Sequence, residues 1–153
     1  MTSVCIRGAE SILTMDDESR ELQTADILIE GGAVVAVGKN LFAPGAIPVD
    51  AGGCVVTPGL VNTHHHLYQN LTRAVPRAQN ALLFDWLRTL YPIWARFGPD
   101  HFYTSTQVGL AELALSGCSL SSDHLYVFPN GARLDDTIDA AATVGVRFQP
   151  TRG

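Results

Sequence analysis

Three consecutive histidines in the first half of the chain have a spacing that suits metal binding. His64, His65 and His66 follow an apolar run that is interrupted at Pro58-Gly59. If residues 60–66 form a strand, successive side chains alternate between its faces, and the Cα atoms of His64 and His66 lie about 6.6 Å apart on one face. Two imidazoles at that separation can converge on one metal ion, with Zn–N bonds of about 2.0–2.1 Å. The spacing therefore predicts His64 and His66 as metal ligands and His65 as a bystander or outer-shell group.

A second interpretation of the same histidines is ordinary packing or surface chemistry, which is the commoner role of a histidine pair on a strand. A purification tag would also give adjacent histidines, but a tag lies at a terminus and does not follow a buried-type strand. The histidines stand where an apolar strand turns polar, which is where α/β folds place their sites. This position favours metal ligation.

Length and composition describe a globular protein with a substantial core. The chain has 153 residues, of which 46% are hydrophobic, enough for one ordinary domain or two small ones. The net charge is −5, and the lysines and arginines are scattered. Without a basic stripe to neutralise phosphates, a nucleic-acid polymer is not an expected partner.

Targeting signals and a cysteine framework are not recognised in the sequence. No apolar run approaches the roughly 18 residues of a membrane helix, and the first residues lack a signal-peptide pattern. Cys5, Cys54 and Cys118 are odd in number, widely spaced and without a C-x-x-C pair. This argues against a disulfide framework and a structural zinc knuckle, so we expect three buried thiols and a cytoplasmic location.

Residues 1–57 have the pattern of short β-strands separated by glycine-containing turns. Gly31-Gly32 stands between two β-rich runs and predicts a hairpin. Asp16–Glu21, Asn40–Ile47 and Val49–Gly53 are expected as turns or loops. The expected strands are residues 4–6, 12–14, 25–30 and 33–37.

After Pro58 the apolar residues recur at helical spacing. A helix is expected over residues 81–91, capped by Asn80 and ended or kinked by Pro92. Its expected packing residues are Leu82, Leu83, Trp86, Leu87 and Leu90. A second helix is expected from Pro99 to about Ser116, with Gly117 as its C-cap.

The remainder of the chain is expected to continue an alternation of strands and helices. We expect a strand over residues 118–124, a helix over 134–144 stopped by Gly145, and a strand over 146–150. The core-facing residues expected in that helix are Ile138, Ala141, Ala142 and Val144. The order strand, helices, strand, helix, strand predicts a parallel sheet with right-handed crossovers. Three strands cannot close a barrel and leave edges unpaired, so we expect the chain to be cut short.

At this point the sequence resembles the amidohydrolase superfamily, in particular the aminohydrolases that act on purines, pyrimidines and s-triazines. Within these it is most similar to the 8-oxoguanine deaminase branch. The resemblance covers essentially the whole chain, and its most specific part is the segment from Pro-Gly to His-x-His. The stretches that carry it are residues 50–53, 56–73, 83–94, 115–124 and 147–153.

The resemblance implies a fold, namely a TIM-type (β/α)8 barrel that bears a small β-sandwich. Residues 1–57 would form the N-terminal part of the composite β-sandwich, and residues 58–153 the first three barrel strands. A complete barrel takes about 250 residues. The chain is thus expected to be an N-terminal fragment of an α/β enzyme, with an incomplete barrel and inactive by itself.

The resemblance also implies a chemistry, the hydrolysis of a non-peptide C–N bond. One divalent metal ion, zinc or alternatively iron, would be held by His64, His66 and ligands from later strands. The metal lowers the pKa of a bound water to about 7. The resulting hydroxide attacks the ring carbon that bears an exocyclic amine, and ammonia leaves. No catalytic residue beyond the metal ligands is expected within the fragment.

The partners implied are a small heterocyclic base of the 8-oxoguanine type and water, with a homo-oligomer compatible with the full-length protein. Gln69 follows the metal pair by three residues, and His124 and Arg152 end the second and third barrel strands. Each is a candidate for substrate binding, with a surface or supporting role as the alternative. Asp123 is a candidate to orient His124 or to cap the next turn.

Two other functions remain open on the sequence alone. The same fold can act on a triazine or cytosine-type ring, releasing chloride, an alkylamine or ammonia. A function of another class is a metal-free binding or assembly module that docks on a partner through its open sheet edge.

Overall fold

The computed structural model describes residues 2–153. The chain divides into two compact units, Met1–Pro58 and Gly59–Gly153. Among the described residues, none of the helices combines the length and the apolarity that crossing a membrane requires.

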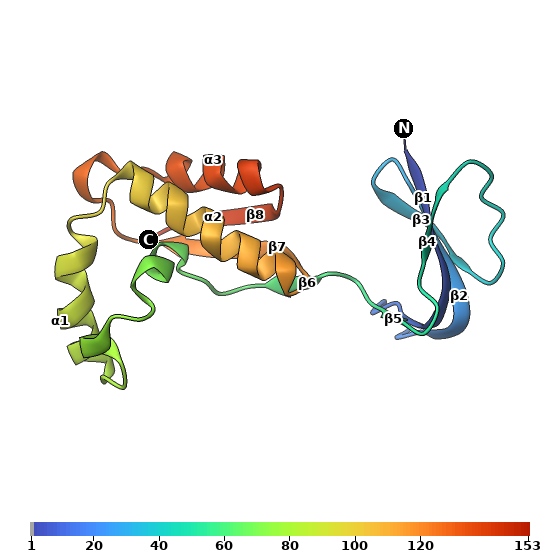
Figure 1. The fold of residues 1–153 in the computed structure, drawn as a ribbon, viewed down its shortest axis with the longest axis horizontal. Coiled ribbons are helices and arrows are strands. Elements are labelled where there is room, and N and C mark those ends of the chain that lie inside the picture. Colours follow the sequence, from blue (N-terminus) through green and yellow to red (C-terminus); the bar gives the residue numbers. More distant parts are fainter. Residues whose placement is uncertain (1) are drawn as a thin grey trace. The chain divides into compact units, whose positions relative to one another are not determined.

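The first unit is a five-stranded sheet built around its first strand (Figure 1). Strand β1 (Ser3–Leu13) pairs antiparallel with β2 (Glu21–Glu30) and parallel with β4 (Ile47–Asp50) and β5 (Val55–Val56). Strand β2 also pairs antiparallel with β3 (Ala33–Gly38). The buried side chains between these strands are Ala9, Ile12, Ala25, Ile27 and Ala51.

The predicted hairpin between β2 and β3 is confirmed. Gly31 and Gly32 have φ angles of 58° and 84°, which glycine adopts without steric cost. Glu30 and Ala33 pair directly on either side of the turn.

Asp26 on β2 ties the strands of this unit to the loop after β3. Its carboxylate accepts hydrogen bonds from the backbone N–H groups of Gly8 and Leu41, at 2.9 and 3.0 Å, and from the guanidinium of Arg7 at 3.0 Å. These donors favour the charged carboxylate and lower its pKa, the Gly8 N–H most strongly.

The prediction of two short strands, residues 4–6 and 12–14, was wrong. The chain runs through as the single strand β1, with a register shift between Ile6 and Ala9. Gly8, at φ 67°, absorbs the irregularity, and its N–H is bonded to the Asp26 carboxylate on β2 instead of to a backbone carbonyl of that strand. The turn expected over residues 49–53 was partly wrong too, because β4 extends to Asp50.

The second unit contains a three-stranded parallel sheet in the order β6-β7-β8. Its strands are β6 (Leu60–Asn62), β7 (Cys118–Leu125) and β8 (Arg147–Arg152), and the predicted parallel pairing is confirmed. Helices α2 (Pro99–Leu115) and α3 (Leu134–Val144) lie side by side along this sheet (Figure 1). The buried Leu67, Leu110 and Ala141 join the helices to the segment that follows β6.

A second core lies around helix α1 (Leu83–Trp94). The short 3₁₀ helices of this unit are η1 (Leu67–Thr72), η2 (Pro76–Ala78) and η3 (Pro129–Gly131). The Trp94 indole N–H donates to the Thr72 hydroxyl at 3.0 Å, which fixes α1 to η1. The buried members of this core are Tyr68, Ala78, Leu90, Trp94, Phe97, Phe102, Leu125 and Ala132.

Helix α1 differs from its prediction at both ends. Asn80 is not its N-cap but takes a left-handed backbone with φ 61°, and the helix begins at Leu83. Leu82 and Leu83, expected to pack, are 81% and 64% exposed. The helix also continues through Pro92 for two residues, since a proline so near the C-terminus costs only one hydrogen bond.

Side-chain burial differs from prediction at three other positions. In α3 the buried residues are Thr137, Ala140 and Ala141, whereas Ile138 and Ala142 are exposed. Cys54 lies in an exposed turn, while Cys5 and Cys118 are buried as expected.

Candidate metal centre

The histidines lie in an extended loop directly after β6. The strand was expected to run to His66, but it ends at Asn62. The Asn62 side-chain oxygen accepts the N–H of His64 at 3.2 Å, a local turn that takes the chain out of the ladder. One backbone-to-backbone hydrogen bond with β7 persists, in which the His124 N–H donates to the His65 carbonyl at 2.8 Å.

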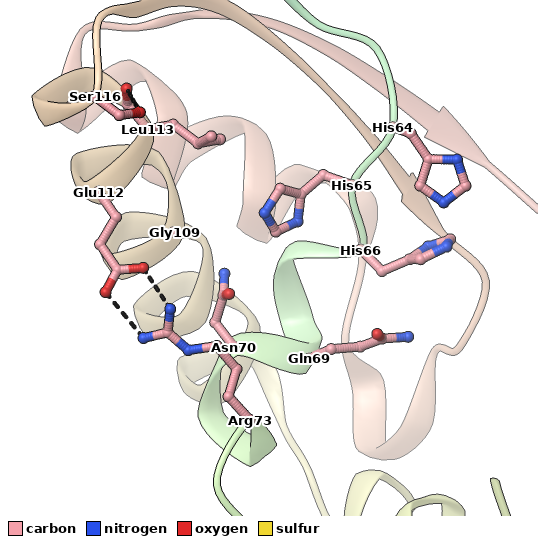
Figure 2. A pocket seen from close by; sticks show the side chains of 10 residues that line it. All are labelled: His64, His65, His66, Gln69, Asn70, Arg73, Gly109, Glu112, Leu113 and Ser116. Atoms are coloured by element: carbon pink, nitrogen blue, oxygen red, sulfur yellow. Dashed lines mark hydrogen bonds and ion pairs between the residues drawn. The ribbon is translucent and has the colours of Figure 1, made fainter. Parts of the chain in front are cut away.

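The side chains of this loop still alternate although the strand has ended. His65 is directed toward helix α2, and the rings of His64 and His66 lie on the other side of the loop (Figure 2). The centroids of those two rings are 5.1 Å apart and the rings are nearly perpendicular. The structure therefore brings His64 and His66 together and separates His65 from them.

His66 is held in one orientation by the neighbouring strand. Its Nδ1 lies 2.8 Å from the backbone carbonyl of His124. A carbonyl oxygen only accepts, so Nδ1 carries the proton and Nε2 has a free lone pair. This is the arrangement by which metal-binding histidines are usually fixed.

The ring of His124, near the end of β7, also has its proton on Nδ1, where a threonine hydroxyl instead of a backbone carbonyl accepts it. The Thr151 hydroxyl donates to the Asp123 carbonyl at 2.8 Å, so its oxygen accepts from His124 Nδ1 at 3.1 Å. The Nε2 atom of His124 is then also an acceptor. The His124 and His66 rings are 5.7 Å apart, so this predicted residue does lie beside the candidate metal pair.

Gln69 and Tyr126 form a polar wall next to His66. The Gln69 amide nitrogen donates to the hydroxyls of Tyr68 and Tyr126, at 3.2 and 3.0 Å. The Tyr126 ring meets His66 edge-on at 5.2 Å. Burial raises the pKa of the Tyr68 hydroxyl, which therefore stays neutral. Tyr126 was not predicted, and its position two residues after His124 was the only signal.

Arg152, the third predicted substrate contact, is placed differently. Its guanidinium stacks over the Phe128 ring at 4.6 Å, and the residue is exposed. It ends β8 at the carboxyl end of the sheet, where it pairs with Leu125, the residue after His124.

Two hollows adjoin the histidine loop, one on each side. The first, of about 340 Å³, faces His64 and His66. It is lined by Thr63, His64, His65, His66, Ser122, Asp123, His124 and Thr151. Its volume lies in the range of small-molecule sites.

The second hollow, of about 520 Å³, lies on the α2 side and contains the ring of His65 (Figure 2). A two-pronged ion pair spans it, with Arg73 Nη1 and Nη2 at 2.6 and 2.9 Å from the Glu112 carboxylate. The Arg73 hydrogen bonds lower the pKa of Glu112. Burial lowers the pKa of His65, so the charged imidazolium is disfavoured there.

Asp123 is a buried carboxylate beneath the loop. It is 1% exposed, its Oδ1 accepts the N–H of Leu67 at 2.8 Å, and its Oδ2 has no hydrogen-bond partner among the described residues. Burial raises its pKa to about 6. Among the described residues the carboxylate bonds neither the His124 ring nor the turn after β7, as the sequence suggested, and instead it accepts the Leu67 N–H at the start of η1.

The donor set fits two ligands of a divalent metal and not a complete site. Within residues 2–153 no cluster of three or more histidine, cysteine, aspartate or glutamate side chains is arranged to hold a metal ion. His66 Nε2 and the adjacent His64 ring offer imidazole nitrogens of the kind that zinc accepts as ligands.

Comparison with known proteins places this geometry among deaminases and hydrolases. The chain is 48% identical over 134 residues to the 8-oxoguanine deaminase of Pseudomonas aeruginosa, covering 83% of this chain and 29% of that protein. It is 39% identical over 160 residues to isoxanthopterin deaminase from an unknown prokaryotic organism, covering 99% of this chain and 33% of the relative. No family model matches the sequence.

Comparison with solved structures also finds hydrolases. The atrazine chlorohydrolase of Arthrobacter aurescens TC1, complexed with zinc, superposes with a TM-score of 0.90 at 34% identity. The match covers 97% of this chain and 35% of that one. This chain is therefore a homologue of the amidohydrolase-family deaminases and hydrolases, and it spans about a third of their length.

Proposed function

We propose that this chain is the N-terminal part of a metal-dependent aminohydrolase that deaminates a heterocyclic base of the 8-oxoguanine type. The observation that carries the proposal is the arrangement of His64 and His66. Their rings share one side of the loop, and the His124 carbonyl fixes the tautomer of His66. This is a pair of neutral nitrogen ligands at the carboxyl end of a parallel strand, where such folds place their sites.

The same proposal assigns the two parts of the chain to the domains of the complete enzyme. Residues 58–153 supply the first three strands of a TIM-type barrel, and residues 1–57 supply part of a β-sandwich domain. The other metal ligands and the general acid and base come from residues beyond these 153. Zinc is the proposed metal, supported by the zinc complex of the homologous atrazine chlorohydrolase.

The residues of this chain have distinct tasks in the proposed reaction. A divalent metal bound at His64 and His66 supplies the activation of water for attack on a ring carbon. His124 Nε2 accepts a hydrogen bond from a ring N–H, and the free oxygen of the Gln69 amide accepts another. Tyr126 forms a flat wall against which a planar heterocycle packs.

Substrate choice is tested by measuring ammonia release from a panel of bases. The full-length protein is incubated with 8-oxoguanine, guanine, isoxanthopterin, cytosine and an amino-triazine. We expect 8-oxoguanine to have the highest kcat/KM, since the relative with that name is 48% identical. Activity on cytosine alone, or on none of the bases with the metal loaded, would contradict the proposal.

A triazine is the second candidate substrate. It is favoured by the structural match to atrazine chlorohydrolase, which superposes over nearly the whole chain. Chloride or alkylamine release from a substituted triazine, with no reaction of any purine or pterin, would move the assignment to this class.

A further inference from the structure

The residue that follows the candidate ligand His66 is held at three points. The Leu67 N–H donates to Asp123 Oδ1 at 2.8 Å, and the Leu67 carbonyl accepts from the Ser105 hydroxyl at 2.6 Å. Its side chain is fully buried against Leu110 and Ala141. The Leu67 N–H is thus fixed by Asp123 on β7, and the Leu67 carbonyl is fixed by Ser105 on α2.

The same short piece of β7 also holds the two preceding histidines. The His124 N–H donates to the His65 carbonyl, and the His124 carbonyl accepts from His66 Nδ1, both at 2.8 Å. With the bond from Leu67, the dipeptide Asp123-His124 makes three hydrogen bonds to the tripeptide His65–Leu67. On the β7 side, two of the three use the backbone of His124, which any residue supplies, and only the bond to the Leu67 N–H needs a specific side chain, that of Asp123.

The buried position of Asp123 is energetically unfavourable for a charged carboxylate. It is 1% exposed, and one of its oxygens has no partner among the described residues. Burying a charged group with incomplete hydrogen bonding is unfavourable. What this position supplies is a buried acceptor oxygen for the Leu67 N–H, which a side chain without an acceptor would leave unpaired.

We propose that Asp123 is a positioning residue for metal binding, because its Oδ1 fixes the Leu67 N–H and thereby the adjacent His66 ring. The inference rests on the proposed metal site. With the Leu67 backbone fixed, the preceding residue His66 is held in the lining of the hollow that His64 also lines. Without the hydrogen bond, the backbone at His66 gains freedom, and the two imidazoles spend less time at the separation that one metal ion requires.

The test compares Asp123→Ala and Asp123→Asn in the full-length protein, with zinc affinity measured by chelator competition. Removing an outer partner of a metal ligand typically weakens metal affinity about 10–100-fold, and we expect Asp123→Ala to lie in that range. Asp123→Asn keeps an acceptor oxygen for the Leu67 N–H and should restore the affinity to within about threefold of wild type. The absorption spectrum of the cobalt-substituted protein should change in the alanine variant and return in the asparagine variant.

Two controls separate positioning from folding. The melting temperature of each metal-free variant is measured, and Asp135→Ala, at an exposed carboxylate on α3, is expected to leave zinc affinity unchanged. Should Asp123→Ala fail to fold, Ser105→Ala, which releases the buried Leu67 carbonyl, is expected to lower the metal-free melting temperature and to weaken zinc binding measured well below that temperature.

Three outcomes have distinct meanings. Wild-type zinc affinity in Asp123→Ala or, where that variant does not fold, in Ser105→Ala would overturn the inference. A loss of zinc affinity in Asp123→Ala that is not restored in Asp123→Asn would also overturn the inference. A wild-type protein that binds no zinc would instead overturn the proposed function itself.

Discussion

His65 and His66 are adjacent residues with opposite chemical surroundings. His66 Nδ1 is bonded to a backbone carbonyl, and its other nitrogen is free on the side of the loop that His64 shares. His65 Nδ1 is buried without a hydrogen-bond partner among the described residues, and burial lowers the pKa of its ring. Only one of the two is arranged as a ligand, although their side chains are identical.

This difference predicts the effect of replacing each histidine. His64→Ala or His66→Ala in the full-length protein should abolish zinc retention and ammonia release, because each removes one of the proposed metal ligands. His65→Ala should leave zinc bound in near-stoichiometric amount. Elemental analysis of the purified variants measures this, and equal metal loss in all three would contradict the assignment.

Asp26 is a buried residue whose charge is expected to stabilise the first unit. Its folded-state pKa is lowered by the Gly8 and Leu41 N–H groups and by Arg7. A lowered pKa means that the stabilisation is complete above the unfolded-state pKa and is lost as the pH falls from about 4 through the folded-state value. Asp26→Asn should therefore cost about 1–3 kcal/mol in free energy of unfolding near pH 7.

The pH dependence provides the check on this assignment. Urea unfolding of wild type and Asp26→Asn is compared from pH 7 to pH 2.5. The difference between their free energies of unfolding should narrow below about pH 4. Asp17→Asn, at an exposed position, serves as the control and should change stability by less than about 0.5 kcal/mol. A gap that widens in acid would contradict the role of Asp26.

At the scale of elements, helix α2 and the 3₁₀ helix η1 approach so closely that only glycine fits between them. A Cβ atom on Gly109 would collide with the Asn70 amide and would lie 2.6 Å from a Leu67 methyl. Within a helix, Gly→Ala usually stabilises by up to about 1 kcal/mol. Here the collision outweighs that gain, because backbone and packed side chains must shift.

We therefore expect Gly109→Ala to destabilise the protein by about 1–3 kcal/mol. Thermal or urea unfolding measures the change. In an Asn70→Ala background the cost should fall, since the nearest colliding group is gone. Equal costs in both backgrounds would mean that Asn70 is not the obstacle.

How far the sequence predicts these elements depends on whether their ends are marked locally. Gly117 and Gly145, both at left-handed φ, end α2 and α3 where expected. The end of β6 depends on a side-chain bond from Asn62, and hydrophobic periodicity does not register such a bond. The pairing of Asp123 with Leu67 joins residues 56 positions apart, so no local pattern reports it.

At the scale of the whole molecule, each unit presents apolar side chains to solvent. Val34, Val35 and Val37 are exposed on β3 in the first unit. Leu82, Leu83 and Phe84 are exposed at the start of α1 in the second. Contiguous apolar surface of this kind normally marks an interaction site.

The 153-residue chain, produced by itself, is expected to bind the dye ANS and to self-associate with rising concentration. Sedimentation velocity at several concentrations measures the association. The variant Leu83→Gln/Phe84→Gln should associate less, because it removes two of the exposed apolar groups. A monomer without dye binding at every concentration would contradict this expectation.

The hydrogen bond between His66 and His124 joins residues 58 positions apart, and this separation has a kinetic consequence. The intervening chain must fold into η1, α1 and α2 before β6 and β7 can pair in parallel, and closing so long a loop is slow. We therefore expect the bond that orients the His66 ring to form late in folding. If the proposed zinc site is complete only once this bond is made, zinc should slow unfolding and leave the refolding rate unchanged.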